Sequence, residues 1–168
     1  MALKFIGLKE ILIGDVAGDG GMGASLASLG GTFRGSAVIN QEDGEKTEFF
    51  EEENDAPFDS ESATGIKSVE WSIYDFTPSK IVQVLGGTVT GVGDDAVWNA
   101  PDTLPSIEQS IRIVSNRASY MNIVRAKIEA KIEGTFSKKE VVLVRIRATV
   151  LAPTKADTPS VVIGKVAS

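Results

Sequence analysis

The clearest alternation of apolar and polar residues lies in the C-terminal third of the chain. From Val124 to Glu133 every second residue is apolar, and Arg, Lys or Glu stands between the apolar positions. The run from Val141 to Leu151 alternates in a similar way around Arg145 and Arg147. A period of two is typical of a strand with one buried face. Because only the polar stretch 134–140 separates the two runs, the pattern predicts an antiparallel hairpin of long strands.

Shorter runs with the same period predict further strands. Val69, Trp71 and Ile73 alternate with polar residues or Tyr, and so do the isoleucines between positions 107 and 113. Residues 11–16 and 161–166 are shorter strand candidates. The Asp43-Gly44 pair is a typical hairpin turn and predicts pairing of residues 33–40 with 45–51. The Glu-rich strand 45–53 has few apolar residues, so we expect it to project from the body of the protein.

One short helix is expected between two turn signals. Thr77 is a suitable N-cap, Pro78 fits the first helical position, and Gly86-Gly87 ends the helix. Its apolar residues would pack on a sheet. The predicted fold is therefore all-β, an antiparallel β-sandwich or barrel with one short α-helix and extended loops. Its 168 residues are expected to form a single domain.

Two segments stand apart from this framework. Residues 17–31 hold six glycines and few large apolar side chains, so we expect a flexible loop. This loop contains a G-x-G-x-x-G match at 18–23, but no helix long enough for a dinucleotide site can follow it. Residues 40–64 form the second segment, an acidic hairpin or loop. Ten carboxylates lie between Gln41 and Glu61, and Lys46 is the only base there.

The amino-acid composition excludes most kinds of catalytic site. The chain has neither Cys nor His, which excludes disulfide scaffolds, thiolate zinc sites, histidine bases and triads. Carboxylates are plentiful, but acid–base catalysis needs two carboxyl groups whose surroundings give them different pKa values, and adjacency in sequence does not provide that. The spacing of the carboxylates also does not fit a calcium-binding loop. A solvated acidic surface is the default interpretation of Glu51–Glu53. We therefore expect no enzyme, no cofactor and no bound metal.

The net charge of −6 conceals an uneven distribution. Residues 1–108 carry 6 basic and 19 acidic side chains, whereas residues 109–168 carry 11 basic and 4 acidic ones. Three explanations remain open: the halves neutralise each other within the fold, the acidic part of one copy meets the basic part of the next, or the basic part binds nucleic acid. The third is the weakest, because no aromatic residues interleave with the basic ones.

In their order along the chain, these elements resemble the phage tail tube, or major tail, proteins. The order is a strand, a short helix, a Gly-Gly-Thr strand, a Trp-x-x-Pro loop and two long paired strands that end near a proline. The resemblance covers about half of the chain, from Lys67 to Pro153, and is carried by five segments: Ser68–Ser72, Leu85–Thr90, Val97–Pro101, Ser137–Glu140 and Val150–Pro153.

This resemblance implies subunits that form hexameric rings, which stack into a hollow tube for DNA, as in the related tube subunits of type VI secretion systems. It implies contacts to itself and to other phage tail proteins, DNA only as passing cargo, and no membrane partner. An extended hairpin or loop would touch the next ring. Our candidates for contacts between subunits come from the two loops and the basic strands: Asp19, Met22, Glu42, Asp43, Glu48, Glu51, Glu52, Glu53, Arg125, Lys127, Lys131, Arg145 and Arg147.

A different class remains open as the alternative. A non-catalytic β-sandwich module that binds carbohydrate or protein would show the same periodicity, and Trp98 is the candidate for an exposed aromatic residue. Trp71 lies on an apolar strand face and is expected in the core. Neither a signal segment nor an apolar stretch of ~18 residues is evident. The expected location is the host cytoplasm during assembly and then the virion tail.

Overall fold

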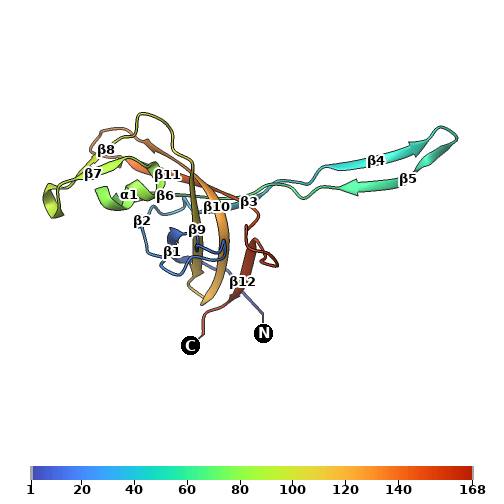
Figure 1. Cartoon of the computed structure of the whole chain (residues 1–168), viewed down its shortest axis with the longest axis horizontal. Coiled ribbons are helices and arrows are strands. Elements are labelled where there is room, and N and C mark those ends of the chain that lie inside the picture. The colour runs from blue at the N-terminus through green and yellow to red at the C-terminus, as the bar shows by residue number, and fades with distance from the viewer. Residues whose placement is uncertain (1, 168) are drawn as a thin grey trace.

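A computed structural model describes residues 2–167 as one curved antiparallel sheet with a long projecting ribbon (Figure 1). Hydrogen bonds of 2.9 and 3.0 Å between Ile13 and Ala27 bring the two edges of the sheet together, so that it nearly closes into a barrel. The predicted all-β fold with one short helix is confirmed. The strands follow the order β1 (Leu8–Asp15), β9 (Ile107–Ser115), β10 (Ser119–Glu133), β11 (Leu143–Val150), β6 (Lys67–Phe76) and β2 (Gly30–Thr32), while β12 (Val161–Lys165) also pairs with β10 and β3 (Val38–Gln41) with β6.

The long hairpin predicted from the alternating pattern is present. β10 and β11 pair in one register from Ala126↔Val150 to Glu133↔Leu143. On one edge, β10 pairs with β12 over Ser119–Ile123 and with β11 from Ala126 onward. On its other edge it pairs with β9, and a bulge between Ile123 and Ala126 interrupts that pairing.

The core fills the inside of the barrel. Side chains from the alternating strands point inward, and Trp71 is among the most buried, as its place on an apolar face predicted. The core also contains Ile11, Ile13, Val69, Ile73, Ile111, Ile123, Ile128, Val144 and Ile146.

The predicted helix spans Pro78–Leu85 (α1). Thr77 occupies the N-cap position with extended backbone but makes no side-chain cap bond, and Gly86 ends the helix. Ile81 and Val84 are buried. Beside α1 lies a small hairpin of β7 (Thr88–Thr90) and β8 (Val97–Asn99), whose connection includes a 3₁₀ turn at Gly93–Asp95.

The hairpin predicted at Asp43-Gly44 is wrong. β3 pairs with β6, whereas β4 (Lys46–Glu51) pairs with β5 (Asn54–Ser62) around a turn at residues 52–53. Gly44 instead lies at the base of the ribbon, where a Cβ would approach the Ala63 carbonyl oxygen to 2.0 Å. Glycine is needed here because the two chains cross too closely for a side chain.

The glycine-rich segment is anchored to the outside of the sheet, whereas we expected a loop too poor in apolar groups to hold itself in place. The Gly23 amide donates a 2.9 Å hydrogen bond to the buried Ser110 hydroxyl. Lys155 donates a 2.6 Å hydrogen bond to the Asp19 carboxylate, which itself accepts one from the Gly21 amide. One buried and one exposed polar contact therefore hold the segment, and its Leu29 belongs to the core.

Within residues 2–167, no helix has the length and apolar character needed to cross a bilayer.

Candidate assembly interface

The β4–β5 ribbon projects far from the barrel, and we call residues 46–62 the arm (Figure 1). Every residue of its two strands is exposed, and the strands pair only with each other. A two-stranded ribbon without a packed face is marginally stable in water. The arm therefore has no packed face within the described part of the chain.

Three phenylalanines lie on the arm, where no hydrophobic core covers their side chains. Phe49, Phe50 and Phe58 are 40%, 55% and 64% exposed, and the rings of Phe49 and Phe58 lie 6.4 Å apart between centroids. Exposed clustered aromatic residues are typical of protein contact sites. From the sequence, only the acidic residues of the arm were predicted as contact residues. The three phenylalanines were not, although aromatic residues in an otherwise polar strand were the available signal.

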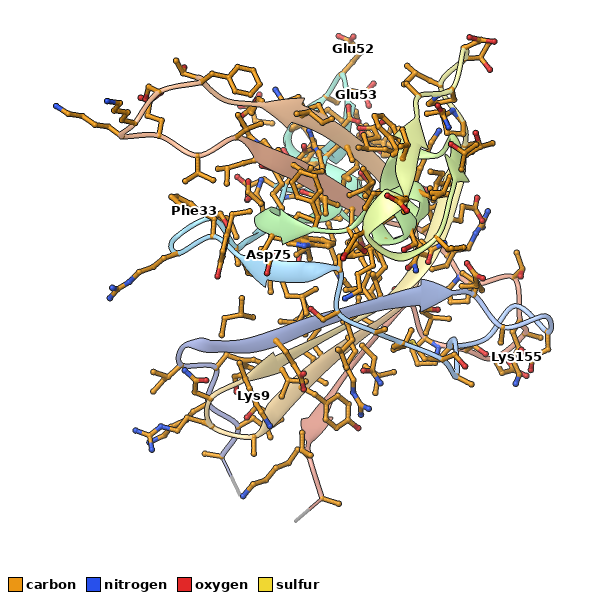
Figure 2. The ribbon with its side chains drawn as sticks, turned by 90° about the vertical axis from the view of Figure 1, so that its left-hand side faces the viewer. Lys9, Phe33, Glu52, Glu53, Asp75 and Lys155 are labelled. Atoms are coloured by element: carbon orange, nitrogen blue, oxygen red, sulfur yellow. The ribbon has the colours of Figure 1, made fainter. Side chains whose placement is uncertain are left out.

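Most of the acidic candidates on the arm have no ion pair within the described residues. Glu48 pairs with Lys46 at 2.5 Å, but within residues 2–167 no ion pair involves Glu51, Glu52 or Glu53 at the turn. Glu42 and Asp43 lie exposed at the base of the arm. The charge without an ion pair is thus concentrated at the turn of the arm, where Figure 2 labels Glu52 and Glu53.

The basic candidates behave differently, because most of them are paired within the fold. Arg125 forms a two-bond contact with Glu108 at 2.8 and 2.7 Å and also donates to the Ala152 carbonyl at 3.1 Å. The hydrogen bonds between the two side chains lower the pKa of Glu108 and raise that of Arg125. Arg125 is therefore mainly an internal contact of the barrel.

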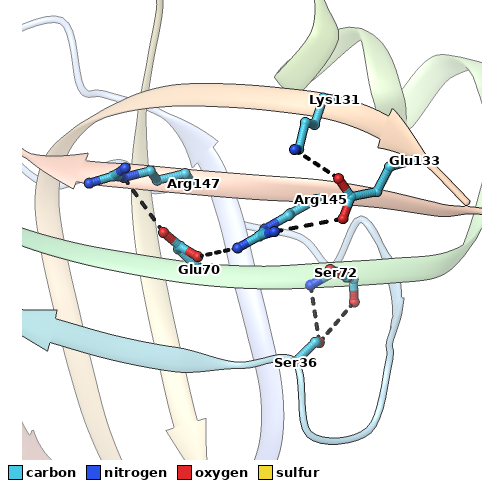
Figure 3. A network of polar contacts seen from close by, with 7 residues as sticks. All are labelled: Ser36, Glu70, Ser72, Lys131, Glu133, Arg145 and Arg147. Atoms are coloured by element: carbon cyan, nitrogen blue, oxygen red, sulfur yellow. Dashed lines mark hydrogen bonds and ion pairs between the residues drawn. The ribbon is translucent and has the colours of Figure 1, made fainter.

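A second group joins the outward faces of β6, β10 and β11 (Figure 3). Arg145 lies 3.0 Å from Glu70 and 3.7 Å from Glu133, and Lys131 lies 2.8 Å from the same Glu133. Arg147 reaches Glu70 at 3.7 Å. The hydrogen bond from Lys131 is the main cause that lowers the pKa of Glu133.

The same view shows how the segment before β3 is held to β6. The Ser36 hydroxyl accepts a 3.1 Å hydrogen bond from the Ser72 amide and contacts the Ser72 carbonyl oxygen at 3.4 Å (Figure 3). Among the basic strand candidates, only the exposed Lys127 has no ion pair within the described part of the chain. The basic strands are thus largely neutralised inside one subunit, while the arm is not.

The two candidates of the glycine-rich segment are likewise engaged internally. Asp19 pairs with Lys155 at 2.6 Å, and the hydrogen bond from Lys155 is the main cause that lowers its pKa. Met22 is half-buried. This segment is therefore a weaker contact candidate than the arm.

Trp98, the aromatic candidate for a binding module, is held by the fold. Its indole N–H donates a 2.8 Å hydrogen bond to the Gly86 carbonyl at the end of α1, and the residue is half-buried. No group of three or more Asp and Glu side chains within residues 2–167 is arranged to hold a metal ion. No known family model matches the chain, and comparison with the curated proteins finds no relative.

Proposed function

We propose that this chain is a structural subunit that self-assembles into stacked rings, of the kind that form a phage or prophage tail tube for the passage of DNA. The single observation that carries the proposal is the arm, a fully exposed ribbon with three unpacked phenylalanines and unpaired carboxylates. A monomer gains nothing from such an element, whereas a subunit that docks its arm on the next copy buries the rings and neutralises the charge.

The rest of the fold is consistent with such an assembly. A contact between a projection and a different surface is heterologous, so it repeats from copy to copy and builds rings or filaments instead of a closed dimer. The resemblance noted above adds the expectation of six subunits per ring, with DNA as cargo in the lumen and other tail proteins at the ends of the tube.

The test reverses the charge at the far end of the arm. We expect the variant Glu51→Lys/Glu52→Lys/Glu53→Lys to fold like the wild type and to fail to assemble, as measured by light scattering after size-exclusion chromatography. The matched control is Asp94→Lys/Asp95→Lys/Asp102→Lys, which makes the same charge change at exposed positions of the α1 side. Equal assembly of the wild type and the arm variant would overturn the proposal.

A further inference from the structure

One end of the barrel is basic and uncovered. Here the segment before β1, the turn between β9 and β10, and the end of β12 meet. The Val166 amide donates a 2.7 Å hydrogen bond to the Ala118 carbonyl, and the Asn116 amide donates one of 3.4 Å to the Gly7 carbonyl. We call residues 2–12, 112–120 and 162–167 the basic end. Glu10 is its only acidic side chain, against five basic ones: Lys4, Lys9, Arg112, Arg117 and Lys165.

A hollow of about 430 Å³ opens on this end. The charged side chains of Lys9, Glu10 and Arg112 line it together with the apolar Leu12, Val114 and Val166. Further apolar side chains are exposed beside it, namely Leu3, Phe5 and Ile6 of the segment before β1. The basic end therefore offers positive charge and apolar surface side by side.

Arg112 is the central feature of the hollow. Ile111 and Ile113 point into the core, so Arg112 between them points outward, in a cross-strand row with Leu12 and Asn122. Its guanidinium lies 4.6 Å from the centre of the Tyr120 ring, which holds the group in place.

This guanidinium lacks a partner. It is half-buried, yet no carboxylate of residues 2–167 pairs with it, and its Nε, like the neighbouring Asn122 Oδ1, is buried without a hydrogen-bond partner in the described part of the chain. A partly desolvated charge without a counter-ion is unfavourable, and a planar guanidinium fixed by stacking is well suited to a carboxylate. A carboxylate from another molecule would supply the counter-ion that the described residues do not.

We propose that the basic end is the receiver for the arm of a second copy of this chain. The inference rests on the proposed function and names the surface that the arm contacts. Arm and receiver match in two respects: the carboxylates of the arm would meet the cations Lys9, Arg112 and Arg117, and its exposed phenylalanines would meet the apolar side chains beside them. In Figure 2, Glu52 and Glu53 lie at the top of the view and Lys9 lies in its lower part. A contact between the arm and the basic end therefore joins two different surfaces and adds copies head to tail.

A rival receiver is the loop between β10 and β11, which exposes Phe136 (95%) beside Lys138 and Lys139. The hollow beside this loop is lined by Glu133 and Glu140 as well as Lys139, so it offers the arm no net positive charge. The basic end is the better match, and the loop supplies the control.

The experiment compares two variants that make the same charge change on exposed lysines and arginines. Lys9→Glu/Arg117→Glu alters the basic end, and Lys138→Glu/Lys139→Glu alters the loop. We expect the first to lose assembly and the second to assemble like the wild type, as measured by sedimentation and light scattering. Circular dichroism and thermal unfolding establish that each variant is folded.

A rescue makes the test specific. Mixing the basic-end variant with Glu51→Lys/Glu52→Lys/Glu53→Lys is expected to restore co-assembly, because the reversed arm of one then meets the reversed receiver of the other. If the basic-end variant assembles like the wild type while the arm variant does not, the receiver is wrong and the proposed function stands. If the wild type itself does not assemble, the proposed function fails and the receiver fails with it.

Discussion

Ser110 connects the glycine-rich segment to the barrel. Its fully buried hydroxyl accepts a hydrogen bond from the Gly23 amide and donates one of 2.7 Å to the Val124 carbonyl. We predict that Ser110→Ala lowers the free energy of unfolding by about 1–3 kcal/mol, because both groups are left buried without a partner. Urea unfolding measures this, and the exposed Ser106→Ala is the control. A loss no larger than that of the control would show that the contact does not hold the segment.

The Glu108–Arg125 pair makes stability depend on pH in acid. Because Arg125 lowers the pKa of Glu108 in the folded state, the pair stabilises the fold fully above the ordinary carboxylate pKa of about 4.3, and this contribution is lost as pH falls through the lowered value. We predict that Arg125→Met raises the pKa of Glu108 towards its ordinary range and weakens the dependence of stability on pH in this window.

An NMR titration of the Glu108 carboxyl carbon measures the shift. Lys127 also lowers the pKa of Glu108, but as the smallest cause, so Lys127→Met is expected to raise it less than Arg125→Met. An unchanged pKa in Arg125→Met would refute the assignment of Arg125 as the main cause.

At the scale of residues, the sequence predicted which side chains are buried, but it did not predict which charged side chains form ion pairs. The period of two identified Trp71 and Ile111 as core residues, because side-chain direction in a strand is a local property. The pairing of Arg145 with Glu70 depends on which strands become neighbours, and nothing local to either residue carries that information. The same reason explains why Arg125 and Arg147 were expected at an interface and are paired internally.

At the scale of elements, the base of the arm depends on two glycines. A Cβ on Gly44 would lie 2.0 Å from the Ala63 carbonyl oxygen, and one on Gly65 would lie 1.8 Å from that of Glu42. We predict that Gly44→Ala opens the base of the arm and speeds proteolysis between residues 42 and 66, while the unfolding free energy of the barrel changes little because the arm packs on nothing. Gly18→Ala is the control, since a Cβ there meets no atom within 4 Å. Equal cleavage in both variants would contradict the prediction.

The strands and the helix that the sequence predicted share strong local signals. α1 has its N-cap position, its proline and its glycine stop, and the β10–β11 hairpin has an unbroken alternation. The arm shows the limit of such signals. Asp43-Gly44 is a good turn sequence, but β3 pairs with β6 and β4 pairs with β5. The actual turn therefore falls at Glu52-Glu53, which has no turn-forming residue.

At the scale of the whole molecule, the basic and acidic parts of the chain differ in how far ion pairs neutralise their charge. The basic strands are largely neutralised by Glu70, Glu108 and Glu133 within the chain, whereas in residues 2–167 no ion pair involves Glu51–Glu53 of the arm or Lys9, Arg112 and Arg117 of the basic end. We predict that assembly weakens as salt rises from about 0.05 to 0.5 M, because exposed charge contacts are screened. Light scattering across this range measures it. Assembly that is unaffected by salt would show that the phenylalanines alone carry the contact.

The central claim is that the chain assembles with itself through the arm. The most direct measurement is negative-stain electron microscopy of the concentrated wild type at low salt, beside the variant reversed at Glu51, Glu52 and Glu53. We predict rings or hollow tubes for the wild type and single particles for the variant. Single particles of the 17.8 kDa chain at every concentration of the wild type, or tubes in both samples, would contradict it.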